Sequence, residues 1–235
     1  MTTPYYKKFS LEELGIDTQC FLKHLRPAYE TLTWDRFDTL RGGLEKPTRQ
    51  RALAEFSLKK NQQQWQIKRV PAKPYVQTQD HGDYNRTEPR EYPEVDETVT
   101  DHPEVFKLLN EIANIVASLR SEVQNLRIIF TFLRTVDEEG RTGICALEGG
   151  PHIDGMDYIV SALVMNRENL ESNSGESSVY SLDGEALLRT VLQPGEGIFH
   201  DDLQLMHDIS NISRKIRNKR GIRDMLGIDI EIINP

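Results

Sequence analysis

A change of pattern near residue 125 constrains the fold of this 235-residue chain more than any other feature. The residues that follow it form short runs rich in β-branched and aromatic side chains, separated by Gly, Asn, Ser and Pro. Such runs are typical of antiparallel strands in a double-sheet sandwich or jelly roll. We expect strands at 126–133, 157–164, 178–181, 187–192, 197–199, 203–206 and 225–233, and a returning strand at 143–147 after a turn at 137–140.

The first half of the chain is expected to be mainly helical. Apolar side chains recur at helical spacing over residues 105–119, and Asp101 is a suitable N-cap for this helix. A capping box that begins with Ser10 predicts a helix start near residue 11. A second helix is expected to begin after Asp17 and to run to about Leu25, ahead of Pro27, because proline disturbs a helix interior.

These elements predict an α+β fold, with a double-stranded β-helix (jelly-roll or cupin-like) core and the N-terminal helices packed on one face. The length suits one domain over 1–235, helical and irregular to about residue 125 and a metal-binding jelly roll from about 126 to 235. An alternating run at 64–67 adds a strand to the first part. The stretch 71–101 contains four prolines, and so long an irregular loop predicts a lid over a site.

Composition narrows the class of protein. The formal net charge is −8 and the pI is about 5.3, which argues against a general nucleic-acid or anionic-membrane surface. Neither a signal peptide nor an apolar run long enough for a membrane span is recognisable. Cys20 and Cys145 lie far apart and are expected to be reduced thiols. A cytoplasmic protein is therefore expected.

Histidine and carboxylate side chains offer candidate metal ligands. Two histidines and one carboxylate on one face suit a redox-active iron, because they leave coordination positions for a co-substrate and oxygen. In a strand, the pattern His-x-Asp places both side chains on the same side. This pattern, with either acid at its third position, occurs at four of the six histidines: His81-Gly-Asp83, His102-Pro-Glu104, His152-Ile-Asp154 and His200-Asp-Asp202.

Context favours His152 and Asp154. His102 opens a helix, His81 lies ahead of the strands, and His200 lies too close to His207 to come from a separate, opposite strand. His152 and Asp154 instead lie between two expected strands. His207 follows 55 residues later (207 − 152), so distant strands can bring the three residues together at the mouth of a barrel.

An arginine after His207 would suit a dicarboxylic co-substrate, because a guanidinium binds a carboxylate through two parallel hydrogen bonds. Arg214, Arg217 and Arg220 lie in a basic run that reads as a surface turn. Arg223 lies 16 residues beyond His207 (223 − 207), at the start of the last expected strand. It is therefore the candidate that can point into the barrel.

The ordered set of motifs resembles one oxygenase family, the bacterial 2-oxoglutarate/Fe(II) dioxygenases typified by L-isoleucine 4-hydroxylase, which act on free aliphatic amino acids. The resemblance covers roughly residues 30–233. Its motifs are Glu148-Gly-Gly-Pro-His152-Ile-Asp154-Gly155, Asp157-Tyr158, Asn166-Arg167-Glu-Asn169, Gly175-Glu-Ser177, Asp201-Asp202 and Gly221-Ile-Arg223-Asp224, with weaker support from Tyr75, Gln77, Tyr84-Asn85 and Arg90. The chain departs from the family pattern over 168–177, where the family is more compact, and at the doubled glycine with Pro151 before His152.

The resemblance implies a jelly roll with Fe(II) held by His152, Asp154 and His207, and with the C5 carboxylate of 2-oxoglutarate bound by Arg223. It also implies an enzyme that hydroxylates an unactivated C–H bond of a free L-amino acid, most simply an aliphatic one, while O2 and 2-oxoglutarate become succinate and carbon dioxide. The expected partner is the amino acid, not a nucleic acid or a membrane, and a homodimer is compatible with the sequence.

Three residues are candidate substrate contacts by location alone: Glu148, Arg134 and Arg167. A zwitterionic amino acid needs a cation for its carboxylate and an acidic or carbonyl group for its amine. For each of the three, an ion pair or a loop cap explains the residue equally well. Tyr158 and Trp34 are expected to be core residues.

Four alternatives remain open. The same iron chemistry can desaturate a substrate or close a ring, and the substrate can be a modified or carrier-bound amino acid. Two histidines and a carboxylate can also hold zinc, as in hydrolytic sites. A cupin-like protein without oxygenase activity would have a similar pattern.

Overall fold

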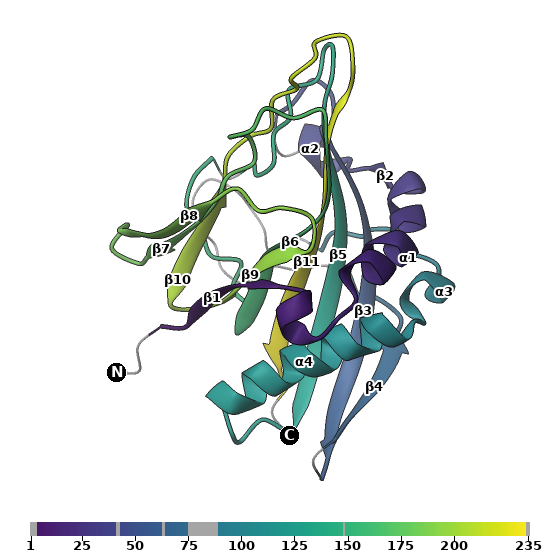
Figure 1. Cartoon of the computed structure of the whole chain (residues 1–235), viewed down its shortest axis with the longest axis vertical. Coiled ribbons are helices and arrows are strands. Elements are labelled where there is room, and N and C mark those ends of the chain that lie inside the picture. Colours follow the sequence, from purple (N-terminus) through teal and green to yellow (C-terminus); the bar gives the residue numbers. More distant parts are fainter. Residues whose placement is uncertain (1–3, 41–42, 63, 75–88, 148, 234–235) are drawn as a thin grey trace.

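The computed structural model describes residues 4–40, 43–62, 64–74, 89–147 and 149–233. Two antiparallel sheets and a layer of helices make up its architecture (Figure 1). The major sheet has the strand order β1-β9-β6-β11-β5-β3-β2, with β4 also paired to β3, and the minor sheet has the order β10-β7-β8. Its strands are β1 (Tyr6–Ser10), β2 (Thr33–Trp34), β3 (Arg49–Asn61), β4 (Gln64–Val70), β5 (Asn125–Asp137), β6 (Tyr158–Glu168), β7 (Ser177–Ser181), β8 (Ala186–Thr190), β9 (Glu196–Asp201), β10 (Leu205–Ile209) and β11 (Gly221–Ile232).

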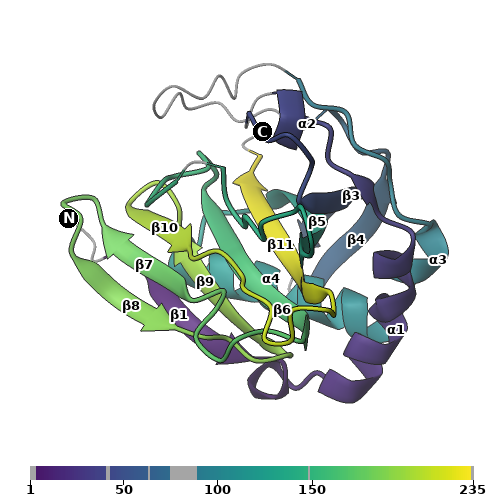
Figure 2. The ribbon, with the colours of Figure 1, turned by 90° about the horizontal axis from the view of Figure 1, so that it is seen from above.

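Helices α1 (Thr18–Glu30), α3 (Glu97–Thr100) and α4 (Pro103–Leu119) cover one face of the major sheet, and the minor sheet lies on the other side (Figure 2). The short helix α2 (Phe37–Leu40) lies apart from this layer, with Phe37 in the wall of the cavity between the sheets, and η1 (Glu12–Leu14) is a 3-10 turn. This arrangement confirms the predicted α+β fold with a jelly-roll core. None of these helices is long and apolar enough to cross a bilayer, as judged from the described part of the chain.

The two faces of the central strands serve different purposes because successive side chains of a strand point to opposite faces. On β11, Leu226, Ile228 and Ile230 belong to the large core beneath α1 and α4. Met225 belongs to the smaller core between the two sheets. The side chains of Arg223 and Asp229 therefore point to the side of the minor sheet, where the candidate site lies.

Several local expectations were wrong. Strands β1 to β4 lie in the N-terminal part, where only the strand at 64–67 was expected, and all four belong to the major sheet. The expected strand at 143–147 is a single bridge between Gly143 and Ile212. By contrast, the helix start expected near residue 11 is confirmed: Ser10 Oγ accepts from the Glu13 amide at 3.3 Å, and a single 3-10 turn follows at η1.

Tertiary contacts explain the two differences in the helices. Helix α1 continues through Pro27 to Glu30, because Tyr29 is buried and its hydroxyl donates to the Met225 carbonyl at 2.9 Å. The Pro27 defect falls in the last turn, where this contact offsets it. Helix α4 is capped by His102 and not by Asp101, because His102 Nδ1 accepts from the Glu104 amide at 3.2 Å.

Residues 75–88, the middle of the predicted lid, lie outside the described residues. At its C-terminal end the segment is fixed to the major sheet, where the Leu53 amide donates to the Pro93 carbonyl at 2.9 Å and the Val95 amide donates to the Leu53 carbonyl at 3.0 Å.

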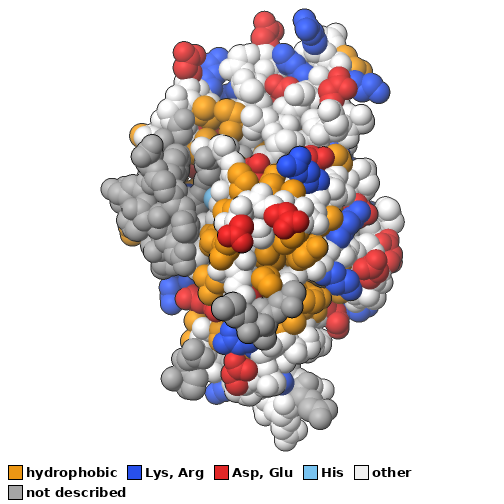
Figure 3. Space-filling view, turned by 90° about the vertical axis from the view of Figure 1, so that its left-hand side faces the viewer, with side chains coloured by type: hydrophobic (Ala, Val, Ile, Leu, Met, Phe, Trp, Pro, Cys, Tyr) orange, Lys and Arg blue, Asp and Glu red, His pale blue; other side chains and the backbone are white. Residues whose placement is uncertain are grey.

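The outer face on the side of the minor sheet carries acidic and basic side chains interspersed among apolar ones (Figure 3).

Candidate metal centre and its cavity

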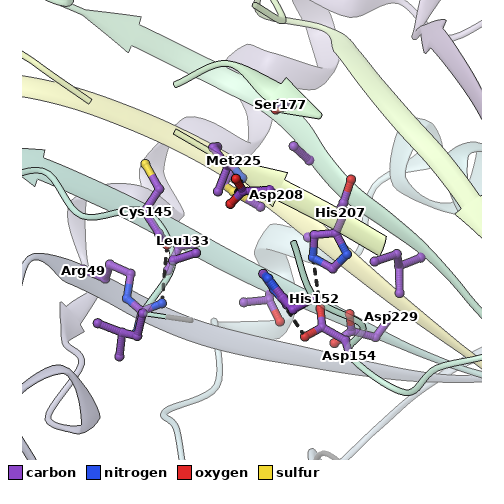
Figure 4. Close-up of a pocket in the computed structure, with 18 of the residues that line it drawn as sticks. Arg49, Leu133, Cys145, His152, Asp154, Ser177, His207, Asp208, Met225 and Asp229 are labelled. Carbon is purple, nitrogen blue, oxygen red and sulfur yellow. Dashed lines mark hydrogen bonds and ion pairs between the residues drawn. The ribbon is translucent and has the colours of Figure 1, made fainter. Parts of the chain in front are cut away.

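His152, Asp154 and His207 converge at one end of a cavity between the two sheets (Figure 4). His207 Nε2 lies 3.5 Å from Asp154 Oδ2, and His152 Nε2 lies 4.0 Å from Asp154 Oδ1. One ligand atom from each residue can be chosen so that all three lie within 4.8 Å of one another. Two imidazoles and one carboxylate at this spacing fit a divalent iron and leave positions for other ligands.

The backbone holds the two histidines together. The His152 amide donates to the His207 carbonyl at 3.0 Å, and the His207 amide donates to the His152 carbonyl at 2.9 Å. His207 belongs to β10, whereas His152 lies in the loop ahead of β6. His152 Nδ1 lies 2.9 Å from the Gly150 carbonyl oxygen, which fits a protonated Nδ1 and leaves the Nε2 lone pair facing Asp154.

A second carboxylate, Asp202, lies behind the cluster and is fully buried. Its Oδ2 accepts hydrogen bonds from the amides of Asp154, Gly155 and Met156 at 3.0, 2.7 and 2.9 Å. Its Oδ1 lies 3.6 Å from His207 Nδ1. The turn that carries Asp154 and the ring of His207 therefore face the same carboxylate.

The reason for which His200 was set aside, its short distance from His207 along the chain, was wrong. His200 lies in β9 and His207 lies in β10, so the two come from different sheets, and their ring centroids are 5.3 Å apart. His200, Asp202 and His207 form a second group with ligand spacing. Burial, reinforced by the nearby His207, lowers the pKa of His200 to about 4, so its ring is neutral at physiological pH.

Arg223 lies on β11, next to residues that line the cavity. Met225, two residues along β11, and Leu133, the partner of Met225 on β5, line the cavity, whereas Arg223 and its own β5 partner Thr135 are not among the lining residues. The guanidinium is fully buried, and Nε, Nη1 and Nη2 have no hydrogen-bond partner among the described residues. Burial lowers the pKa of Arg223 from its ordinary value. A buried cation of this kind needs an anion, and a carboxylate fits its planar donor set.

Gly175 packs directly against the side chain of Arg223, where a larger residue would not fit. Its φ is +69°, and a Cβ there would lie 3.0 Å from Arg223 Cδ and 3.2 Å from Arg223 Nε. Only the absence of a side chain lets the loop between β6 and β7 approach so closely. The close approach covers Arg223 on that side and contributes to its complete burial.

The three candidate substrate contacts are not brought together in the cavity. Arg134 lies on the helix-covered face, where its guanidinium binds Asp224 at 2.7 and 3.0 Å and reaches Glu30 at 3.2 Å. Arg167 is the partner of Arg223 on β6, and its Nη2 donates to the Ser174 carbonyl at 2.7 Å. Glu148 lies outside the described residues. Tyr158 is a core residue, as expected.

Other charged residues line the cavity that sequence reasoning did not select: Arg49, Arg51, Arg90, Asp208 and Asp229. Arg49 is bound by the buried Asp38 through contacts of 2.6 and 2.8 Å, and Arg51 Nε lies 3.4 Å from Asp35. A signal for Asp229 was present in the sequence, because it interrupts an apolar strand that is buried on both faces. Charged residues are almost never placed there without a partner or a role.

Comparison with known proteins agrees with this geometry. A family model described as 2OG-Fe dioxygenase matches residues 26–229. No curated protein sequence matches the chain. Among solved structures, a bsmA homolog from Methylobium petroleophilum superposes with a TM-score of 0.80 at 21% identity, covering 98% of this chain and 91% of that one.

Two further structures are similar over nearly the whole chain. IDO from Bacillus thuringiensis has a TM-score of 0.73 at 13% identity and covers 97% of this chain and 90% of its own. The Fe(II)/(alpha)ketoglutarate-dependent dioxygenase TqaL has a TM-score of 0.70 at 16% identity and covers 97% and 82%. At these identities the likeness establishes the shared fold.

Proposed function

This chain belongs to the 2OG-Fe dioxygenase family, and from that premise we propose that it hydroxylates an unactivated C–H bond of a free L-amino acid. Fe(II), 2-oxoglutarate and O2 are the cofactors and co-substrates of this family. We assign the iron to His152, Asp154 and His207, and the C5 carboxylate of 2-oxoglutarate to Arg223.

The observation that carries the assignment is the pairing of two features on the same side of the major sheet. A cluster of two histidines and a carboxylate lines the cavity between the sheets, and a buried guanidinium without a hydrogen-bond partner among the described residues lies on β11, two residues before the cavity-lining Met225. A dicarboxylic co-substrate needs both, because one end meets the metal and the other needs a countercharge. When bound, iron and 2-oxoglutarate supply the oxidant from O2 and release succinate and carbon dioxide.

The residues of the chain would then position the reactants. Arg223 would orient 2-oxoglutarate, and the buried walls of the cavity would limit the access of water to the metal. Leu133, Met225 and Ile159 contribute apolar surface to these walls. An aliphatic side chain placed against them would present its C–H bonds to the metal.

The charged residues near the metal support an amino acid as substrate. Arg51 and Arg90 line the same cavity as Asp229, so groups of both signs face the space beside His152 and Asp154. The α-carboxylate of an amino acid needs a cation such as arginine, and its α-ammonium group needs an anion such as aspartate. We therefore assign recognition of the substrate backbone to Arg51, Arg90 and Asp229 in place of Arg134 and Arg167.

The direct test is succinate formation by the Fe(II)-loaded enzyme with 2-oxoglutarate, air and a panel of free amino acids, followed by mass spectrometry of the products. We expect succinate to rise with one amino acid and its product to gain one oxygen, and the His152→Ala variant to be inactive. A product lighter by two hydrogens would instead indicate desaturation or ring closure. No succinate with any panel member, including no uncoupled background, would contradict the oxygenase assignment.

A further inference from the structure

We propose that Asp202 is a positioning residue of the metal centre, in which each carboxylate oxygen has a separate task. Oδ2 would fix the turn that carries Asp154, and Oδ1 would accept the Nδ1 proton of His207. The inference rests on the proposed metal site. It assigns a role to a residue outside the ligand set and makes two of the three ligands depend on one side chain.

The hydrogen bonds of Asp202 divide unevenly between its two oxygens. Oδ2 accepts from three consecutive amides, those of Asp154, Gly155 and Met156, at 2.7 to 3.0 Å. Oδ1 has one longer contact with the Asp154 amide, at 3.3 Å. Three donors on one oxygen satisfy its lone pairs, so Oδ1 is the oxygen that can take a further donor.

The ring of His207 supplies that donor. Its Nε2 lies 3.5 Å from Asp154 Oδ2, and its Nδ1 lies 3.6 Å from Asp202 Oδ1, just beyond hydrogen-bond distance. In the proposal this short gap closes to a hydrogen bond when Nε2 binds the metal. A histidine that binds a metal through Nε2 must carry its proton on Nδ1. A carboxylate at Nδ1 fixes this tautomer and raises the basicity of the ligand nitrogen.

A different role for Asp202, as the ligand of a second metal ion with His200 and His207, is less compatible with these contacts. The three residues have ligand spacing. However, Oδ2 is already committed to three amides, and His207 would have to serve one ion through Nε2 and another through Nδ1. Since all three side chains are also buried, we assign Asp202 to the support of one ion.

The substitution Asp202→Asn separates the two tasks. An asparagine can keep its amide oxygen toward the three backbone amides while its NH2 group faces His207 Nδ1. The NH2 group of the asparagine and the Nδ1–H group of His207 would then both be donors facing each other. The tautomer of His207 with its proton on Nδ1 would no longer be favoured. The matched control is Asp201→Asn: Asp201 accepts from Gln204 Nε2 at 2.7 Å and from the Leu203 amide at 3.2 Å and contacts none of the three assigned ligands through these bonds.

Cobalt(II) serves as the probe, because it occupies such sites and shifts the NMR signals of its ligands. In Co(II)-loaded wild-type protein we expect two slowly exchanging imidazole N–H signals, one from His152 bonded to Gly150 and one from His207 bonded to Asp202. In Asp202→Asn we expect the His152 signal to remain, the His207 signal to move or disappear, and the Kd for Co(II), followed by visible absorption, to rise by about 10- to 100-fold. Asp201→Asn should match the wild type.

The outcomes separate the two proposals. If Asp202→Asn melts earlier but keeps both N–H signals and the wild-type Kd, Asp202 only caps the turn and the inference is wrong. If the variant does not fold, the wild-type spectrum decides, since a single slowly exchanging signal would also overturn it. If wild-type protein fails to bind Co(II), the metal site itself is refuted, which is a different result from a wild-type site that Asp202→Asn leaves unchanged.

Discussion

Arg223 offers the sharpest test of the assignment, because its substitution is expected to move two measurements in opposite directions. The side chain is fully buried, and its nitrogens have no hydrogen-bond partner among the described residues. An uncompensated buried charge destabilises a fold, and replacing it with an apolar group of similar length removes that cost. We therefore predict that Arg223→Met is more stable than wild type in the absence of 2-oxoglutarate.

The magnitude follows from the surroundings. Replacing buried charges by apolar groups stabilises proteins by about 1–4 kcal/mol. Burial lowers the pKa of Arg223 and the neighbouring Arg167 lowers it further, whereas Cys145 and Asp224 act in the opposite direction and offset part of the penalty. We expect the lower part of that range, about 1–2 kcal/mol. At about 2–4 °C for each kcal/mol in a chain of this size, Tm should rise by about 2–8 °C.

Affinity for 2-oxoglutarate should change in the other direction. A hydrogen bond to a charged group contributes about 1.5–3 kcal/mol, so its loss raises the Kd roughly 10- to 150-fold. Calorimetric melting without co-substrate and anaerobic titration of the metal-loaded protein with 2-oxoglutarate measure the two effects. Arg217→Met, in an exposed loop, is the control and should alter neither. A less stable Arg223→Met with unchanged affinity for 2-oxoglutarate would refute the reasoning.

Three further predictions follow from other contacts. Gly175→Ala should destabilise the fold by at least about 1 kcal/mol, because its φ is +69° and the new Cβ meets Arg223 Cδ at 3.0 Å, and it should weaken 2-oxoglutarate binding in the same titration. Burial alone would raise the pKa of Glu55, but hydrogen bonds from Arg127 and the Lys73 amide outweigh it and lower the pKa. The pair of Glu55 and Arg127 therefore stabilises the fold at a pH above 4.5, the ordinary pKa of glutamate, and this stabilisation is lost as the pH falls below that value. Urea unfolding should therefore show Glu55→Gln to be less stable by about 2–3 kcal/mol at pH 7, with a difference that shrinks toward pH 3. Anaerobic Fe(II) at 100 times its Kd should stabilise chelator-treated protein by about 2.7 kcal/mol, or about 5–11 °C in Tm, and a chelator-treated protein whose Tm ignores Fe(II) would count against the metal site.

The strand-rich half of the fold was predictable because its periodicity is local. The run at 126–133 contains enough β-branched and aromatic residues to be recognised without tertiary information, and it became the centre of β5. The length of α1 was not predictable in the same way. The contact that carries the helix past Pro27 joins Tyr29 to Met225, 196 residues away, and no local signal reports it.

In the candidate site, too, features that depend on neighbouring residues could be predicted, and features that depend on distant residues could not. The spacing of His152, Asp154 and Arg223 could be recognised because strand geometry and charge chemistry act within short segments. The role proposed for Asp202 could not be read from the sequence, since it depends on amides 46 to 48 residues earlier in the chain. His200 was misjudged because seven residues seemed too few to reach another sheet, whereas a turn between β9 and β10 achieves this.

Two backbone hydrogen bonds join His152 to His207, one in each direction. They hold together the two ends of a segment that extends 55 residues along the chain and includes β7, β8 and the stretch 168–177. Insertions or deletions in the loops of that segment change its outer surface, while His152 and His207 keep their spacing. The loops, and with them the substrate, can therefore change during evolution while the metal ligands stay in place.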